Sequence, residues 1–578
     1  MKKHYSKLLV PALFILLIYM AGCVSTEIPG NYNVDPEVLE ATGGTVNFKV
    51  TGTVPEKSFH KKAKVEFTPY VKYDGKTKEL DKFTLRGEKT EGDGTVINSK
   101  TGGSFTYTQS FEYTDEMKDA ELFVSPKIIK GSKEQTFDDI KIADGIIVTY
   151  QNVLHDEKTI QAPSGYEKET IISEMATIYF RQNMHNLNWS MELNQDAKEK
   201  REQLDEFLMN GWEIKDIKID AWASPEGELS FNENLAEDRS ETAKKYMEDR
   251  LKTTDRKLAK EKGVKESEIE RTPKYNASSH GEDWDGFMKA VKNSDIKDKS
   301  TIINVVNSQS DVAKREQEIR NMTVIYNEVA DEILPPLRRA EITVNCFEPK
   351  RSDEEIAELA ATSPDSLTYK ELLHAADLTD DNQAKYNIYK AGFTHPDRDW
   401  KTYNNAAVEA LALGKMDEAE NYLNQANKLA PGNGIIENNL GVLSSRKENY
   451  QDAEMHFMNA QKAGEDVSYN LGIIAIQKGE YQKALTQFKN IDCDHNVALA
   501  QLLSGKMNEA FNNLKCAPES PKTFYMLAVY GARTNNADLV YEYLGKAVAK
   551  DSSMKAKAKD DKEFVKFADN DQFKNIVN

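Results

Sequence analysis

The chain has 578 residues, of which 39% are hydrophobic and 30% are charged, a composition typical of a well-solvated protein with several cores. Its formal net charge of −19 argues against a nucleic-acid partner and against a surface lying flat on anionic lipid, because both need concentrated Lys and Arg. Four cysteines are too few for a disulfide scaffold, and their spacing matches no zinc pattern.

The N-terminus has the organisation of a secretory leader. Lysines occupy positions 2, 3 and 7, an apolar run follows over 8–19, and Met-Ala-Gly-Cys ends at Cys23. This ending resembles the lipobox of bacterial lipoproteins, with Met20 where that family prefers Leu. The resemblance implies that 1–22 is a signal peptide and that Cys23 carries acyl chains, which anchor a protein stably when there are two or more. The alternative is an ordinary secreted protein with a chance cysteine.

A short lipidated tether is expected over 23–35, followed by a β-domain over 36–165. Residues 46–50 alternate apolar and polar side chains, as do 65–67 and 105–107. Short alternating strands separated by turn residues predict a β-sandwich, which carries no evident chemistry. We expect it to act as a spacer or as a protein-contact domain.

Residues 170–348 form a mixed α/β pattern with one distinctive turn. A strand near 214–221 leads into Ser224-Pro225-Glu226-Gly227, and Asn232 and Arg239 stand eight and fifteen residues after Ser224 on the next helix. These offsets resemble the OmpA-like (OmpA C-terminal) domain family, whose last strand would begin near Arg338. The highly charged stretch from about 253 to 310 is predicted to be an insertion into that domain.

The OmpA-like resemblance implies a peptidoglycan site. In that family an Asp of the turn and an Arg of the helix hold the diaminopimelate of the wall peptide, and Arg239 matches the Arg. Ser224 stands where the Asp belongs, so Glu226 is the candidate substitute carboxylate. The expected wall-binding set is Ser224, Glu226, Asn232 and Arg239. The alternative is that the fold serves only assembly, with Arg239 paired to acids of its own helix.

The region 352–578 is helical and repetitive. Ala384, Ala419, Ala453 and Ala484 recur at spacings of 35, 34 and 31 residues, each with Leu, Ile or Phe four positions later. Small residues beside large ones let antiparallel helices approach closely, and the spacing resembles the tetratricopeptide repeat (TPR) family. The charged C-terminal end would cap the stack.

Asparagines recur at one place in three successive repeats. Asn405, Asn439 and Asn470 each lie just before the small pair of the first helix. In the TPR family this position faces the concave groove, where an amide can bind the backbone of an extended peptide. We therefore expect these residues to form a peptide groove for a protein partner. The alternative is that they are solvated members of the repeat consensus.

Motifs of catalysis are lacking in the sequence. It contains no His-Glu-x-x-His, no Gly-x-Ser-x-Gly and no phosphate loop. The prediction is a non-catalytic protein without metal or cofactor: an outer-membrane lipoprotein of the Bacteroidota type that faces the periplasm and acts as an adaptor between the cell wall and a protein. The alternatives are an accessory subunit of an outer-membrane assembly or secretion complex without wall binding, and a surface adhesin. A bridge between Cys493 and Cys516 is left open.

Overall fold

The chain divides into two compact units, the second of which interrupts the first in sequence. The computed structural model describes residues 31–578, apart from the side chains of residues 31 and 323–325, so Cys23 and the predicted leader lie outside the described residues. The first unit joins the segment ending at Ser164 to Pro364–Asn578, and the second unit is Gly165–Ser363. The sequence predicts three domains in line, whereas the structure has a central domain inserted between two halves of one unit.

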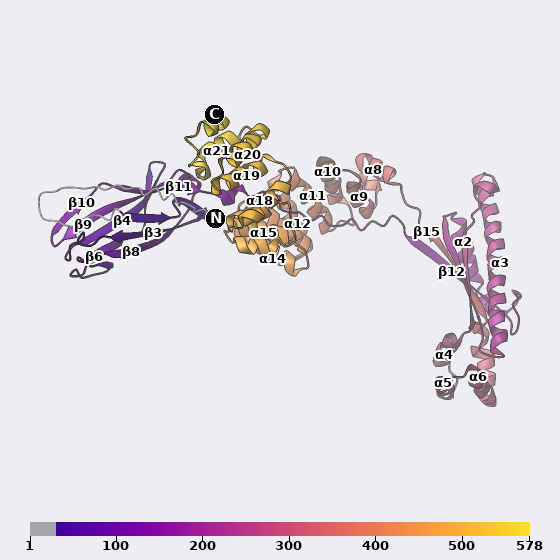
Figure 1. Cartoon of the computed structure of the whole chain (residues 1–578). Coiled ribbons are helices and arrows are strands. Elements are labelled where there is room, and N and C mark those ends of the chain that lie inside the picture. The colour runs from indigo at the N-terminus through magenta and orange to yellow at the C-terminus, as the bar shows by residue number, and fades with distance from the viewer. Residues whose placement is uncertain (1–30) are drawn as a thin grey trace, which may run out of the picture. The chain divides into compact units, whose positions relative to one another are not determined.

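The first half of unit one is a β-domain (Figure 1). Its strands are β1 (Asn31–Asp35), β2 (Val38–Thr42), β3 (Thr45–Val54), β4 (Lys64–Tyr73), β5 (Lys76–Glu79), β6 (Phe83–Gly87), β7 (Thr95–Ile97), β8 (Gly103–Glu112), β9 (Glu121–Lys130), β10 (Lys133–Thr136) and β11 (Ile140–Ile147). Strict alternation buries every second side chain of β3, including Val46, Phe48 and Val50, in one core that strands β4 and β9 also line.

The β-domain is a single sheet and not the expected pair of sheets, because strand β2 pairs on both of its sides. It pairs antiparallel with β3 and parallel with β11, which joins all strands into one sheet of 11 strands. Two boundaries also differ from the prediction. The first strand begins at Asn31, inside the expected tether, and residues 153–164, although assigned to the β-domain, follow its last strand as an extended segment.

The second half of unit one is a stack of antiparallel helix pairs (Figure 1). The helices are α9 (Tyr369–Ala375), α10 (Asn382–Ala391), α11 (Trp400–Ala412), α12 (Met416–Leu429), α13 (Gly434–Arg446), α14 (Tyr450–Lys462), α15 (Ser468–Gln477), α16 (Tyr481–Gln487), α17 (His495–Leu503), α18 (Met507–Cys516), α19 (Pro521–Arg533), α20 (Ala537–Lys550), α21 (Met554–Asp560) and α22 (Asp571–Val577).

Glycine sets the close approach within the helix pairs. A Cβ on Gly441 of α13 would lie 2.6 Å from the ring of Phe457 on α14, and one on Gly472 of α15 would lie 2.3 Å from the ring of Phe488. Ala453 and Ala484 are fully buried at the same seams. The prediction of repeated helix pairs packed on small residues is confirmed, and the region resembles a tetratricopeptide solenoid.

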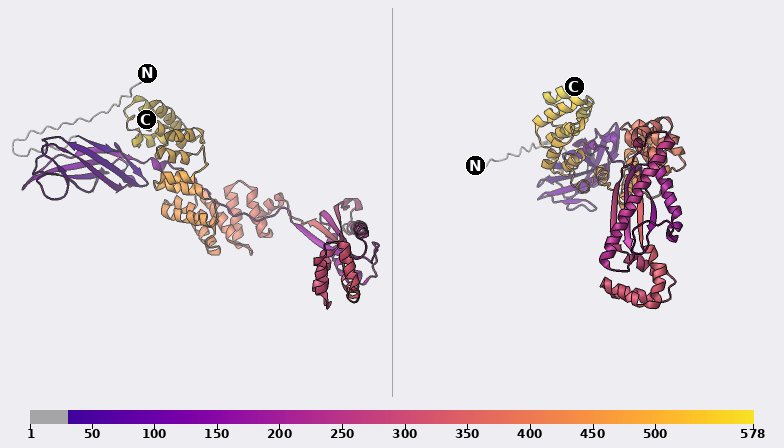
Figure 2. Two further views of the ribbon diagram at one scale, coloured as in Figure 1. Left: turned by 60° about the horizontal axis from the view of Figure 1, so that its bottom comes forward. Right: turned by 90° about the vertical axis from the view of Figure 1, so that its right-hand side faces the viewer.

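Unit two has a four-stranded sheet in the order β12-β15-β13-β14, in which β13 and β14 are parallel and the other pairs antiparallel. Figure 2 shows the long helix α3 lying along this sheet. The elements are β12 (Ile171–Tyr179), α1 (Glu192–Asp196), α2 (Lys198–Met209), β13 (Ile214–Ala223), α3 (Leu229–Lys262), β14 (Lys274–Glu282), α4 (Trp284–Asn293), α5 (Lys299–Ser308), α6 (Val312–Asn321), α7 (Thr323–Glu328), β15 (Arg339–Phe347) and α8 (Asp353–Thr362).

The insertion in unit two lies further along the chain than predicted. Residues 253–262 continue α3, because Leu251, Leu258 and Ala259 keep a buried stripe among many charges. Residues 274–282 are the edge strand β14, whose mostly exposed polar residues give no hydrophobic alternation to detect. The helical excursion runs from α4 to the turn before β15 and has its own core around Phe287 and Val291. Within residues 31–578, no helix combines the length and apolarity needed to span a membrane.

Candidate functional site

The face that the first helices of four repeats form, called the groove below, holds an extended segment of the same chain. Residues 152–162, which follow the β-domain, run along the first helices of four repeats, from α17 toward α11. The segment therefore passes the repeats in the order opposite to their order in the sequence. Four asparagines on α11, α13, α15 and α17 contact its backbone.

Each of these asparagines binds both backbone groups of one residue of the segment. Leu154, Lys158, Ile160 and Ala162 donate their amides to the Oδ1 atoms of Asn496, Asn470, Asn439 and Asn405 at 2.7, 2.7, 2.9 and 2.7 Å, respectively. In return, the Nδ2 atoms donate to the carbonyls of the same four residues at 3.0, 2.9, 2.7 and 2.9 Å. Because an amide side chain offers a donor and an acceptor together, one asparagine replaces one step of a β-ladder.

Neighbouring asparagines fix the orientation of this ladder. Asn438 donates to the carbonyl of Lys158 and accepts from Asn470, while Asn404 donates to the carbonyl of Ile160 and accepts from Asn439. Sequence reasoning selected Asn405, Asn439 and Asn470 and missed Asn404, Asn438 and Asn496. Asn496 could have been found, since it also stands just before a pair that ends in a small residue, Val497-Ala498, but its spacing of 26 residues from Asn470 breaks the period.

Side chains of the segment add specific contacts. Glu157 is 4% exposed and accepts hydrogen bonds from Ser445 and His155, while Tyr469 donates to Asp156 at 2.9 Å. Burial raises the pKa of Glu157, but the hydrogen bonds from His155 and Ser445 outweigh it and hold that pKa below its ordinary value. Gln161 donates to Glu409, so the segment is recognised by more than its backbone.

The β-domain contacts the repeats directly beside this segment. Arg533 of α19 forms ion pairs with Glu40 of β2 and with Glu563, and Thr149 donates to Glu563. His495 lies 2.9 Å from the carbonyl of Asn152, where the segment enters the groove. The ladder and these contacts together hold the two halves of unit one.

The predicted wall-binding residues of unit two meet at one end of β13 and α3, where all are buried. Ser224, Glu226, Asn232 and Arg239 are 4%, 6%, 2% and 1% exposed. Glu226 accepts from Ser224 at 2.6 Å and forms an ion pair with Arg338 at 2.7 Å. The carboxylate expected to receive an ammonium group is therefore already paired within the protein.

Arg239 is engaged with the backbone. Its guanidinium donates to the carbonyls of Met184, Trp222 and Arg181 at 3.1, 2.9 and 3.1 Å. Burial, together with the charge of Arg338, lowers its pKa to about 9. The alternative reading, in which Arg239 pairs with acids of its own helix, is not what these contacts show. The side chain therefore holds the loop of Arg181 and Met184 against the end of β13.

Two more carboxyl groups from neighbouring elements crowd this cluster. Glu282, at the end of β14, accepts from Asn232 at 2.8 Å and from the indole of Trp284 at 2.9 Å. Glu316 of α6 is 5% exposed and lies against Glu282. Burial and this hydrogen-bonded neighbour raise the pKa of Glu316 to about 8. No group of three or more His, Cys, Asp or Glu that could hold a metal occurs among residues 31–578.

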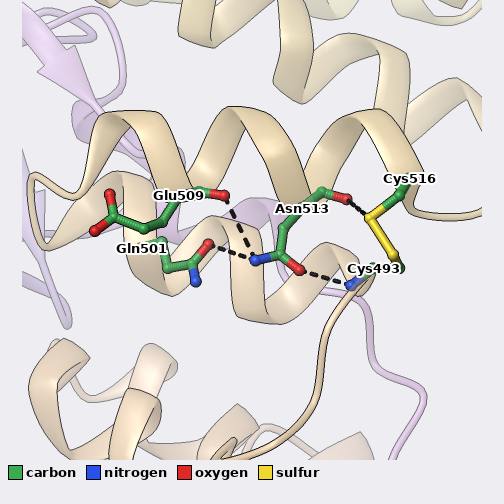
Figure 3. Close-up of a disulfide and its surroundings, with 5 residues drawn as sticks. All are labelled: Cys493, Gln501, Glu509, Asn513 and Cys516. Atoms are coloured by element: carbon green, nitrogen blue, oxygen red, sulfur yellow. Dashed lines mark hydrogen bonds between the residues drawn. A yellow bond between two sulfur atoms is a disulfide. The ribbon is translucent and has the colours of Figure 1, made fainter.

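A disulfide joins Cys493 and Cys516 at the end of one repeat (Figure 3). The Cα atoms are 4.8 Å apart, and Asn513 accepts from the amide of Cys493 at 2.6 Å. The bridge ties the loop before α17 to the end of α18. Cys346 is buried and free.

Comparisons with known proteins give weak likenesses. No protein-family model matches the chain, and no curated protein matches it. Among solved structures, the chain is similar to a tetratricopeptide repeat protein from Parabacteroides merdae, at 15% identity over 39% of this chain and 91% of that one, with a TM-score of 0.30. It is also similar to YrrB, a TPR protein with an unusual peptide-binding site, at 21% identity over 30% and 97%, with a TM-score of 0.25. PilW, a type IV pilus biogenesis factor, matches at 16% identity over 40% and 100%, with a TM-score of 0.28. The repeat assignment rests on the helix packing described above.

Proposed function

We propose that the protein is a non-catalytic scaffold of the cell envelope, attached to the outer membrane by lipid at Cys23 and facing the periplasm as an accessory subunit of an envelope complex. The observation that carries the proposal is the stack of helix pairs α9–α22, which the asparagine ladder joins to the β-domain of the same chain through hydrogen bonds. Repeat stacks of this kind present large surfaces for protein contacts.

The disulfide supports a location in the periplasm. Bridges between cysteines form and persist in oxidising environments such as the periplasm and are rare in the cytosol. The Cys493–Cys516 bridge is therefore compatible with export directed by the predicted leader of residues 1–22.

Burial of the predicted wall-binding cluster favours a scaffold over a wall adaptor. Diaminopimelate could reach Arg239 only if three hydrogen bonds to carbonyls were broken, and it could reach Glu226 only by displacing Arg338. Removing one partner of a buried ion pair typically costs about 3–5 kcal/mol. We therefore do not propose that this cluster binds peptidoglycan.

Three measurements test the proposal. Affinity purification from detergent-solubilised membranes after crosslinking in living cells is expected to yield a stoichiometric envelope protein. Wild-type protein is expected to stay in the supernatant with purified peptidoglycan, and sedimentation would restore the wall-adaptor hypothesis. A Cys23→Ala variant is expected to leave the membrane fraction and to incorporate no radiolabelled fatty acid. Retention of this variant in the membrane would refute the anchor.

A further inference from the structure

We propose that the groove of α11, α13, α15 and α17 is an internal receptor whose occupant is residues 152–162 of the same chain, and that it is therefore closed to peptides from other proteins. The groove would serve to dock the β-domain onto the repeats, two parts of unit one that unit two separates in the sequence. This inference rests on the proposed scaffold function and places its partner contacts outside the groove.

The hydrogen-bonding capacity of the groove is used by the segment. Asn439 donates its two amide protons to the carbonyl of Ile160 and to Asn404, and Asn470 donates its two to the carbonyl of Lys158 and to Asn438. Each also accepts one amide of the segment. A peptide from another protein could not accept a hydrogen bond from Asn439 or Asn470 unless it first displaced residues 152–162.

The segment also fits the groove through side chains of the right size and chemistry. Val153 is 1% exposed within the apolar core of the C-terminal repeats, Ala162 is 3% exposed, and the carboxylate of Glu157 is buried on Ser445. A backbone-only receptor would accept any extended sequence. Three buried positions within ten residues indicate a site built around this one.

Covalent connection gives the resident segment its advantage over a free peptide. The β-domain, to which the segment is covalently joined, contacts the repeats through the ion pair between Glu40 and Arg533, and His495 of α17 lies against the Asn152 carbonyl where the segment begins. Contacts linked in this way act at an effective concentration in the millimolar range. A peptide of the same sequence at micromolar concentration should therefore not displace the segment.

The test cuts the chain directly after the segment and leaves the segment in the groove. A protease site inserted directly after the exposed Gly165 of the full, detergent-solubilised chain allows one cut between the segment and unit two. The N-terminal fragment is expected to remain bound to residues 166–578 and to co-elute with them at micromolar concentration. Separation of the wild-type fragments without denaturant overturns the proposal.

Variants identify the groove as the contact. The double variant Asn439→Ala, Asn470→Ala is expected to weaken fragment association by about 100-fold or more, since each asparagine contributes at least two hydrogen bonds. The Asn439→Asp variant keeps the acceptor and the size but turns a carboxylate oxygen toward the Ile160 carbonyl and the Asn404 amide oxygen, so it should weaken association by about 10-fold or more. Asn424→Ala, on the exposed face of α12, is the matched control and should change nothing. Unchanged association in the double variant overturns the proposal.

Closure of the groove is tested on the uncut chain. A fluorescent peptide of residues 152–163 is expected to remain free in the presence of the intact protein at up to about 100 μM, far below the effective concentration of the tethered segment. Binding of this peptide at micromolar concentration would show an open groove and overturn closure. Loss of partner co-purification with intact fragment association would instead refute only the scaffold function.

Discussion

The asparagine ladder permits a quantitative prediction for Asn439→Ala. The substitution removes the acceptor of the Ile160 amide, at 2.9 Å, and one of two donors to the Ile160 carbonyl, at 2.7 Å; Asn404 still donates to that carbonyl at 3.2 Å. Each net hydrogen bond is worth about 1 kcal/mol, and a half-buried amide left without a partner costs a further 1 kcal/mol or so. We expect the free energy of local opening at residues 158–162 to fall by about 2–3 kcal/mol.

Hydrogen exchange measured by mass spectrometry reads this quantity directly, because protection reports local opening even where the whole protein does not unfold in two states. A loss of 2–3 kcal/mol corresponds to about 30- to 150-fold less protection of the Ile160 amide. Protection of the β-domain core should not change, and Asn424→Ala should match the wild type. Undiminished protection at Ile160 in a folded Asn439→Ala variant would show that the segment is not held by the ladder.

Two further predictions concern packing and pH. Gly472→Ala should destabilise the repeats by about 1–3 kcal/mol in thermal melts, because the new methyl group would lie 2.3 Å from the ring of Phe488. Gly545→Ala on α20, where nothing lies within 4 Å, should instead stabilise by up to about 1 kcal/mol. Glu316 has its pKa raised to about 8 by burial and by its neighbour Glu282, so the stability it contributes is present below its ordinary pKa and is lost as pH rises through about 8. Limited proteolysis of α6 should therefore accelerate between about pH 5 and pH 8 in the wild type but not in Glu316→Gln, and equal acceleration in both would refute this assignment.

Much of the architecture could be predicted because it depends on local pattern. Alternation in 46–50 specifies a strand with one buried face, and alanines spaced by 31 to 35 residues specify helix pairs that pack closely. The asparagines of the groove were found in the same way, because their place within the repeat is a local property. The edge strand β14 escaped this reasoning, since a strand with no buried face leaves no periodic signal.

Burial and pairing between distant segments could not be predicted from the sequence. The resemblance to the OmpA-like family predicted that Arg239 binds a ligand, but only the folded unit brings the carbonyls of Arg181, Met184 and Trp222 around it. Likewise, the amide of Ala162 meets Asn405 across 243 residues of sequence. Periodicity determined that the chain has a β-domain and repeated helix pairs, and the resemblance to the TPR family implied a groove able to hold an extended peptide. Only the tertiary structure decided which peptide fills the groove. The contacts between residues 152–162 and the repeats join segments that are far apart in the sequence, and no local sequence pattern records them.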